Sequence, residues 1–214
     1  SDWTGLGSMK TRKGTYDSAI ITEAKRVYSW LTVKDKYVLD VGANFGAFTR
    51  MALNGGAKEV VAYEPEAENF SFLQTNCTDE RAVLVQAALI SGEENKIDFY
   101  LTTSGKNPGN YSTTEFRGRD KITVPAVNFA KALEVFEPDA IKMDCEGSEY
   151  DLLLNCPLPD CVQEIALEIH LNKPEWRETL APQLVKLFED WETVVEPTIG
   201  EKNWHTMAGY RRKK

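Results

Sequence analysis

Residues 38–49 read VLDVGANFGAFT, a short apolar run that passes through a glycine-containing turn into a helical pattern. The run Tyr37–Val41 predicts a buried strand, because a few mostly apolar residues that end at glycine are typical of strands inside a sheet. The residues Ala47–Leu53 predict a helix, which Gly55 and Gly56 would end. A strand that leads directly into a helix is the first part of a βαβ unit, so this stretch indicates an α/β fold.

The same alternation continues along the chain. Strands are predicted at Glu59–Tyr63, Ala82–Leu89, Ala140–Met143 and Glu164–Ile169, and helices at Asp17–Leu31, Glu66–Asn76, Ser148–Leu154 and Glu175–Trp191. Glu192–Glu196 and His205–Tyr210 predict a closing antiparallel pair. The sequence therefore predicts a Rossmann-like, doubly wound α/β fold with a mostly parallel, seven-stranded sheet and an antiparallel C-terminal strand pair.

A β-strand insertion at about residues 91–127 follows the third strand. Lys96–Leu101 and Lys121–Val127 alternate as strands do, and Pro125 predicts that the second of them lies at a sheet edge. The polar stretch between them, Thr103–Arg119, is either a disordered loop or a segment that recognises a substrate, since long polar insertions in compact domains are usually functional or mobile.

The length of 214 residues suits one domain, which we place at residues 14–214. Residues 1–13 are interpreted as an N-terminal tail, and Gly7-Ser8-Met9 is typical of an expression-vector scar ahead of a native methionine. No apolar run approaches the roughly 20 residues of a membrane span, and no signal peptide is visible. The four cysteines form no CxxC pair. These features predict a cytoplasmic protein with reduced thiols and no membrane partner.

The net charge is −8, because Lys and Arg number 25 and Asp and Glu number 33. Binding to a phosphate backbone normally needs a basic face. The charge balance therefore makes nucleic acid an unlikely partner.

In a doubly wound sheet, ligands bind beyond the carboxyl ends of the strands, so the residues that follow each strand are the candidate site residues. They are the loop Asp40–Gly46, the pair Glu64-Pro65, the pair Ala87-Ala88, the segment Asp144–Gly147 and the strand end Glu168–His170.

Two of these strand ends indicate a ligand that contains adenosine. Gly42 lets the backbone approach a ligand closely, and Glu64 can accept hydrogen bonds from both ribose hydroxyls. A dinucleotide fingerprint would continue with glycines at positions where this chain has Asn44 and Ala47. S-adenosylmethionine, which has no phosphate, therefore fits better than a nicotinamide dinucleotide.

Four segments resemble the FkbM-type methyltransferases, a class I group that uses S-adenosylmethionine. They are, in the family's order, VLDVGANFGAFT, VVAYEPEAENFSFLQTN, AIKMDCEGSEYDLL and ALEIH. The resemblance covers about residues 36–171, and residues 141–149 are its most specific part. It implies an O-methyltransferase that acts on a hydroxyl of a saccharide or secondary metabolite.

The resemblance also implies roles for single residues. It assigns the cofactor site to Asp40, Gly42, Ala43, Asn44, Gly46, Glu64, Pro65, Ala87, Ala88 and Asp144. Glu64 would hold the ribose, Pro65 would lie beside the adenine, and Ala87 and Ala88 would lie at the adenine edge.

The candidate catalytic residues are His170, Asp144 and Glu146, at the ends of two neighbouring strands. A hydroxyl is a poor nucleophile until its proton is removed, and an imidazole with the ordinary pKa of about 6.5 can remove it near neutral pH. A lone histidine is otherwise often a hydrogen-bonded core group. A second hypothesis places Mg²⁺ on Asp144, Glu168 and His170, where it would acidify the hydroxyl. Glu149 is interpreted as favourable charge at a helix N-terminus.

Three alternatives remain open at this point. A nicotinamide-dependent oxidoreductase could use the same fold, although the glycine spacing weighs against it. A nucleic-acid methyltransferase is disfavoured by the acidic charge balance. A non-catalytic binding domain could keep the same fold.

Overall fold

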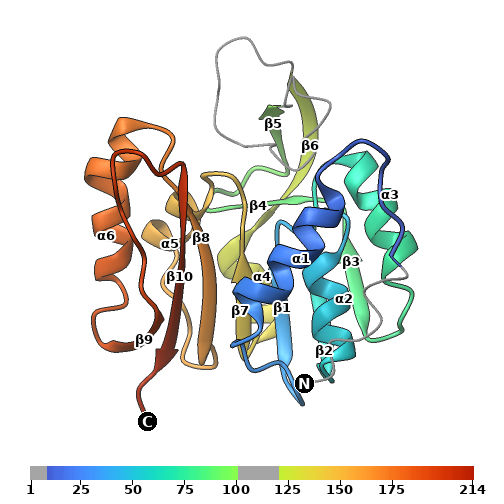
Figure 1. Ribbon diagram of the computed structural model, residues 1–214, viewed down its shortest axis with the longest axis horizontal. Helices are drawn as coiled ribbons and strands as arrows, with labels where there is room; N and C mark the ends of the chain where they lie inside the picture. The colour runs from blue at the N-terminus through green and yellow to red at the C-terminus, as the bar shows by residue number, and fades with distance from the viewer. Residues whose placement is uncertain (1–8, 101–120) are drawn as a thin grey trace.

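The computed structural model of the protein describes residues 9–100 and 121–214 (Figure 1). Within these residues the main sheet has seven strands in the order β3-β2-β1-β7-β8-β10-β9. Its strands are β1 (Tyr37–Val41), β2 (Glu59–Tyr63), β3 (Ala82–Val85), β7 (Ala140–Met143), β8 (Glu164–His170), β9 (Trp191–Val195) and β10 (His205–Arg212). β10 is antiparallel to β8 and β9, whereas the other neighbours are parallel. The predicted fold class is confirmed.

Helices cover both faces of this sheet (Figure 1). One face packs against α1 (Asp17–Tyr28), α2 (Ala47–Asn54) and α3 (Ala67–Asn76). The other packs against α4 (Phe129–Phe136), α5 (Glu149–Asn155), a π-helical turn (Trp176–Leu180) and α6 (Ala181–Lys186). Two apolar layers with the sheet between them are the doubly wound arrangement.

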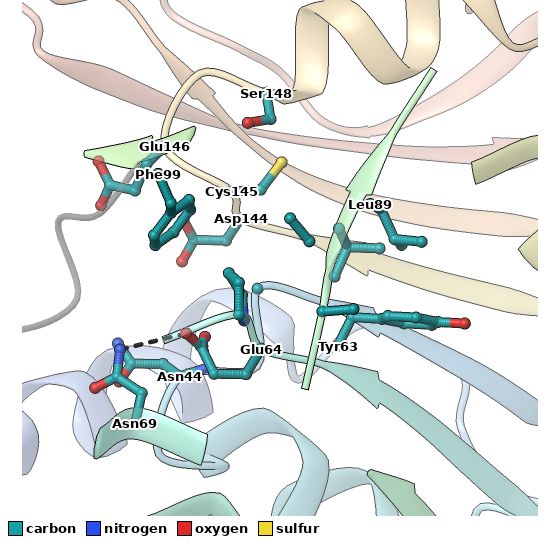
Figure 2. Close-up of a pocket in the computed structure, with 15 residues that line it drawn as sticks. Asn44, Tyr63, Glu64, Asn69, Leu89, Phe99, Asp144, Cys145, Glu146 and Ser148 are labelled. Carbon is teal, nitrogen blue, oxygen red and sulfur yellow. Dashed lines mark hydrogen bonds between the residues drawn. The ribbon is translucent and has the colours of Figure 1, made fainter. Parts of the chain in front are cut away.

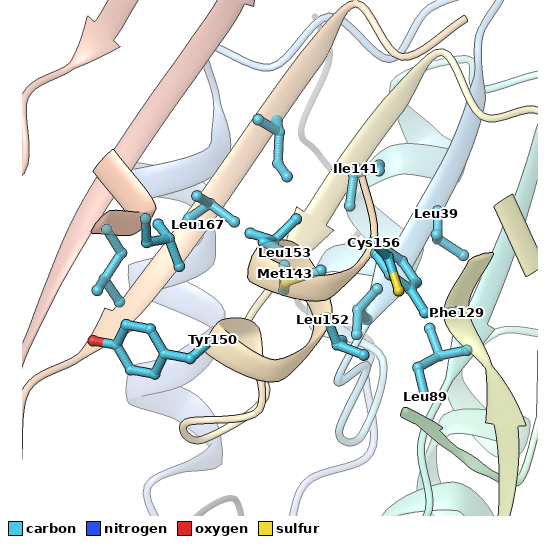
Figure 3. Packing of buried hydrophobic residues seen from close by; sticks show 14 of the residues in the cluster. Leu39, Leu89, Phe129, Ile141, Met143, Tyr150, Leu152, Leu153, Cys156 and Leu167 are labelled. Atoms are coloured by element: carbon cyan, nitrogen blue, oxygen red, sulfur yellow. The ribbon is translucent and has the colours of Figure 1, made fainter. Parts of the chain in front are cut away.

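Successive strand residues divide between the two layers, because strand side chains point alternately to opposite faces. Val38 and Ala140 pack in the layer of α1 and α2. Leu39 and Ile141 pack in the layer of α4 and α5 (Figure 3). Since both faces are covered, the central strands β1, β2 and β7 are mostly apolar, which is the pattern that predicted them.

The two strands of the insertion join the end of the predicted third strand in a second sheet, which within the described residues has three strands in the order β4-β6-β5. Its strands are β4 (Ala88–Ile90), β5 (Lys96–Tyr100) and β6 (Lys121–Asn128), and Figure 1 shows β5 and β6 at the upper edge of the main sheet. The prediction that Pro125 marks an edge strand was wrong, because β6 lies between β4 and β5. β4 pairs only with residues 126–128, so Pro125 has a strand on one side alone.

The predicted third strand, Ala82–Leu89, is two strands in two sheets. β3 ends at Val85, where the amide of Ala87 donates to the Val85 carbonyl (3.0 Å) in a tight turn. The chain then enters β4 and leaves the main sheet. Both strands are apolar, so the sequence shows one continuous apolar run and gives no sign of the turn between them.

The predicted helix Glu175–Trp191 is also interrupted. The π-helical turn comes first, and α6 follows it with Pro182 in its first turn. The helix α4 was not predicted at all. Its signal was nevertheless present: Phe129, Ala132, Leu133 and Phe136 recur at helical spacing, and the Asn128 side chain caps the amide of Lys131.

Residues 9–13, which were assigned to a tail, contact the body of the protein. The amide of Lys10 donates to the side chain of Asn76 in α3 (2.8 Å). The stretch Thr103–Arg119 lies outside the described residues. No helix in the described parts of the chain is both long and apolar enough to cross a membrane.

Candidate active site

A cavity of about 570 Å³, including its open mouth, lies at the carboxyl ends of β1, β2 and β7 (Figure 2). The loop after β1 and Glu64 form one side, and Asp144, Cys145 and Glu146 form the other. Seven of the residues predicted for the cofactor line it: Gly42, Asn44, Glu64, Pro65, Ala87, Ala88 and Asp144. Ala43 lines a neighbouring cavity instead.

Asp40 and Gly46 line neither cavity, so the structure does not support contact with a ligand for them. The Asp40 carboxylate is fully buried, where it accepts a hydrogen bond from the Thr49 hydroxyl (2.6 Å) and pairs with the Lys142 ammonium (3.1 Å). The same ammonium donates to the carbonyl of Gly42 (2.6 Å). Asp40 therefore stabilises the loop through Lys142 and does not face the cavity.

The two loop glycines are required by neighbouring chain segments. A Cβ on Gly42 would lie 1.9 Å from the carbonyl oxygen of Asp144, and a Cβ on Gly46 would lie 2.8 Å from a methyl group of Leu73. Both glycines also have φ in the left-handed region. The close approach predicted for Gly42 is thus to the end of β7, and Gly46 makes room for α3.

Glu64 is buried and held by three donors. Its carboxylate accepts from the amides of Asn44 (2.8 Å) and Glu66 (2.9 Å). It also accepts, more weakly, from the side chain of Asn69 (3.5 Å; Figure 2). Burial raises the pKa of Glu64 to about 7, although these hydrogen bonds oppose the shift. An acceptor placed at the mouth of a cavity suits hydroxyl donors of a ligand.

The rest of this cavity is largely apolar. Val41, Tyr63, Leu89 and Phe99 line it, and of these only Val41 lay in a segment that the sequence predicted for the site. Phe99 comes from β5, so the small sheet supplies part of the wall (Figure 2). An apolar slot beside a carboxylate matches the two halves of adenosine, a planar base and a ribose with two hydroxyls.

A second cavity, of about 980 Å³ with its open mouth, adjoins the first. The two cavities share Gly42, Asn44, Asp144 and Glu146. Other lining residues of the second come from α1 and from the ends of β8 and β10: Glu23, Tyr28, Glu168, His170, Trp204 and His205. All three predicted catalytic residues therefore lie at this junction or beside it.

His170 is held among carboxylates at the end of β8. Its Nε2 lies 3.3 Å from Glu146 and 4.0 Å from Glu168, and its Nδ1 lies 3.1 Å from Glu149. Burial lowers the pKa of the imidazole, but Glu149 and Glu146 outweigh it, and the pKa of His170 stands well above the ordinary value. The ordinary pKa used in the sequence analysis does not apply here.

Glu149 lies in the first turn of α5, as predicted, but it also has a contact that was not predicted. Its side chain is 0% exposed and turned toward β8. Sequence spacing could not reveal this, because the contact joins α5 to a strand 21 residues away.

The predicted Mg²⁺ site on Asp144, Glu168 and His170 does not fit the donors. Glu168 is bonded to His205 (2.7 Å), and the residues that converge are instead Asp144, Glu146 and His170, whose nearest ligand atoms lie within 4.8 Å of one another. Mg²⁺ also prefers an all-oxygen ligand set.

Arg12 is a further residue that sequence reasoning missed. Its guanidinium pairs with Asp17 at the start of α1 (3.0 Å) and donates to the side chains of Asn69 (2.6 Å) and Asn44 (3.4 Å). Because Asn44 and Asn69 are the neighbours of Glu64, the N-terminal segment supports the same cavity.

The sheet order and the cavity at the ends of β1, β2 and β7 define the Rossmann-like fold of class I methyltransferases. Residues 40–198 match the family described as Methyltransferase FkbM domain, and the chain belongs to this family. The predicted resemblance is thereby confirmed. The finding also decides against a nicotinamide-dependent oxidoreductase.

Solved structures agree on the fold. A protein described as a candidate RNA methyltransferase from Pyrococcus horikoshii aligns over 97% of this chain and 95% of its own, with a TM-score of 0.52 at 15% identity. A candidate methyltransferase from Escherichia coli aligns over 96% and 91%, with a TM-score of 0.50 at 13% identity. A ribosomal protein L11 methylase from Lactobacillus delbrueckii subsp. bulgaricus aligns over 89% and 77%, with a TM-score of 0.50 at 14% identity. No curated protein sequence matches the chain.

Proposed function

We propose that the protein transfers the methyl group of S-adenosylmethionine to a hydroxyl oxygen of a small molecule or saccharide. Membership of the methyltransferase family implies the donor. The observation that carries the rest is the junction of two cavities at Asp144 and Glu146, with His170 beside it. One cavity suits the cofactor, and the other leaves space for an acceptor next to it.

In this proposal the first cavity holds the adenosine. Glu64 accepts hydrogen bonds from the ribose hydroxyls, and the apolar wall that includes Leu89 and Phe99 covers the adenine. Gly42 and Asn44, which line both cavities, then lie on the methionine side.

The second cavity is proposed as the acceptor site. Glu23, Asp144, Glu146 and Glu168 line it, and carboxylates accept hydrogen bonds from the several hydroxyls of a sugar. Trp204 lies at its rim with 75% of its surface exposed, where an indole face can pack against a sugar ring. An RNA acceptor is disfavoured, because these carboxylates and the net charge of −8 would repel phosphates.

The proposed reaction is a displacement at the methyl carbon. The acceptor O–H bond breaks, an O–CH₃ bond forms, and the C–S bond of the donor breaks to leave a neutral thioether. The proton passes to the pair formed by Glu146 and His170, whose Oε2 and Nε2 atoms lie 3.3 Å apart; the imidazole accepts it only in its neutral form, which the raised pKa of His170 shifts to higher pH. Bringing the acceptor oxygen and the methyl carbon together in the correct orientation supplies much of the rate.

Cofactor use is tested by isothermal titration calorimetry. S-adenosylhomocysteine, the product of the donor, should bind with a stoichiometry of one, whereas NADH should not bind at the same concentrations. Binding of NADH alone would contradict the proposal.

The acceptor site is tested with radiolabelled S-adenosylmethionine and a panel of neutral sugars, phosphorylated sugars and RNA. We expect transfer to a neutral sugar hydroxyl. With that acceptor, His170→Ala should lower kcat by about 10²- to 10⁴-fold, the usual contribution of a general base, and leave the Kd for S-adenosylhomocysteine unchanged. Full turnover in the variant would remove His170 from the reaction.

A further inference from the structure

We propose that Glu149 is a positioning residue that fixes the imidazole of His170 with Nδ1 turned toward α5 and Nε2 turned toward Glu146. The consequence for the reaction rests on the function proposed above, whereas the orientation itself can be measured without it. Glu149 does not line either cavity, so it would act through His170 alone.

The contacts of Glu149 occupy both of its carboxylate oxygens. Oε1 accepts from the backbone amide of His170 (2.8 Å) and faces the imidazole Nδ1 of the same residue (3.1 Å). Oε2 accepts from the amide of Gly147 (2.8 Å), in the loop that carries Glu146. One buried carboxylate thus binds the strand end, the imidazole and the loop together.

These contacts determine where the imidazole keeps its proton. Carboxylate oxygens only accept hydrogen bonds, so in the protonated imidazole Nδ1 donates to Glu149 (3.1 Å) and Nε2 donates to Glu146 (3.3 Å). Because Glu149 is fully buried whereas Glu146 lines both cavities, the proton on Nε2 is the one that can leave, and the neutral imidazole keeps its proton on Nδ1. Nε2 is then the nitrogen that gains and loses a proton, and it is the one that faces Glu146 (3.3 Å) and Glu168 (4.0 Å). The tautomer follows from the hydrogen-bond network.

A purely structural role is already filled by the next residue. The hydroxyl of Tyr150 donates to the backbone carbonyl of His170 (2.6 Å), which attaches α5 to the same point of β8 without contact to the nitrogen atoms of the ring. Glu149 adds what Tyr150 cannot provide, a negative charge and an acceptor for Nδ1. Tyr150→Phe is therefore the matched control.

The test is an NMR titration of the full chain labelled in histidine. The chain has two histidines, and His205→Asn assigns their signals. The other charged groups near His170 are Asp144 and Glu146 on the loop after β7, Glu168 on β8 and His205 on β10, and they are unchanged in the Glu149 variants. At pH values above the pKa of His170, wild-type protein should show the tautomer with the proton on Nδ1.

Glu149→Gln should lower the pKa of His170 by about 1 to 3, the effect of removing an opposite charge at this distance. Glu149→Asp keeps the charge but shortens the side chain, so it should retain more of the elevated pKa and lose the fixed tautomer. Tyr150→Phe should leave both unchanged. The proposal is overturned if His170 titrates in Glu149→Gln as in wild type, or if Tyr150→Phe shifts the pKa equally. Should Glu149→Gln fail to fold, an unchanged tautomer in Glu149→Asp would overturn it.

Failure of the proposed function would look different. Wild-type protein that bound no S-adenosylhomocysteine would contradict the methyltransferase proposal and leave the imidazole orientation intact. Once an acceptor is identified, Glu149→Gln should shift the pH profile of kcat to lower pH, because the pKa of His170 falls, with KM for S-adenosylmethionine unchanged. An unchanged pH profile would overturn the positioning role.

Discussion

Glu64 shows at the scale of one residue how burial changes the chemistry that its residue type predicts. The sequence identified it correctly as the acid at the end of the second strand, and the structure places it at the cavity with three donors around it. The raised pKa, about 7, follows from burial, which no sequence pattern reports.

This pKa leads to a pH dependence of cofactor binding. Ribose hydroxyls donate to the ionised carboxylate, which predominates above the pKa, so the affinity for S-adenosylhomocysteine should rise as the pH increases from about 6 to 8. Glu64→Gln should weaken binding at pH 8 by about tenfold or more, the loss of a hydrogen bond to a charged group, and should flatten the pH dependence. Calorimetry at several pH values measures both. Equal pH profiles for the two proteins would show that Glu64 does not bind the cofactor.

Two glycines with the same φ make it possible to distinguish the cost of backbone strain from the cost of a steric clash. Gly14 and Gly42 both have φ of +78°, but a Cβ on Gly14 would meet no atom within 4 Å, whereas one on Gly42 would meet the Asp144 carbonyl at 1.9 Å. Gly14→Ala should cost about 1 to 2 kcal/mol of unfolding free energy, the strain alone. Gly42→Ala should cost at least about 3 kcal/mol, or prevent folding. Urea unfolding measures the free energy of unfolding of both variants. Equal losses of stability would refute the close approach of Gly42 to the Asp144 carbonyl.

At the scale of elements, β1 and β7 are joined by a buried ion pair as well as by backbone hydrogen bonds. Asp40 and Lys142 are register partners on these strands, and their side chains meet on the side of α1 and α2. Neither residue was predicted to support the other, because the sequence places them about 100 residues apart.

Lys142→Met should destabilise the protein by about 3 to 5 kcal/mol, since it leaves the buried Asp40 carboxylate without its cation. The control is Lys36→Met, which removes the partly exposed Lys36–Asp139 pair (3.4 Å) and should cost about 1 kcal/mol or less. Chemical unfolding of both variants provides the comparison. Similar losses would mean that the buried pair has no special role.

Elements were predicted well where one apolar pattern coincided with one element. β1, β2 and β7 fulfil this condition, as do α2 and α3. The prediction failed where an apolar pattern continued through a change of partner, at the turn between β3 and β4 and at the π-helical turn before α6. A local apolar pattern indicates that a segment is buried, but it does not indicate which sheet or helix buries it.

At the scale of the whole molecule, the acidic charge balance bears on the choice of acceptor. The Pyrococcus horikoshii protein is described as a candidate RNA methyltransferase, but likeness at 15% identity extends to the fold alone.

With a net charge of −8, the protein should not retain RNA in a filter-binding assay at micromolar concentration and 0.15 M salt, where non-specific binders have Kd values down to on the order of 10⁻⁶ M. A basic RNA-binding protein serves as the positive control for retention. Salt-dependent retention of RNA by this chain would favour a nucleic-acid acceptor.

The sequence by itself determined the alternation of strands and helices, the closing antiparallel pair and the strand ends that carry the site. It could do so because apolar periodicity and glycine positions are local properties of the chain. The tertiary structure decided the contacts of individual residues. Asp40 pairs with Lys142 and so supports the loop, Gly42 packs against the carbonyl of Asp144, and the Glu149 side chain contacts His170. These outcomes depend on burial and on contacts between segments far apart in the chain, which exist only after folding.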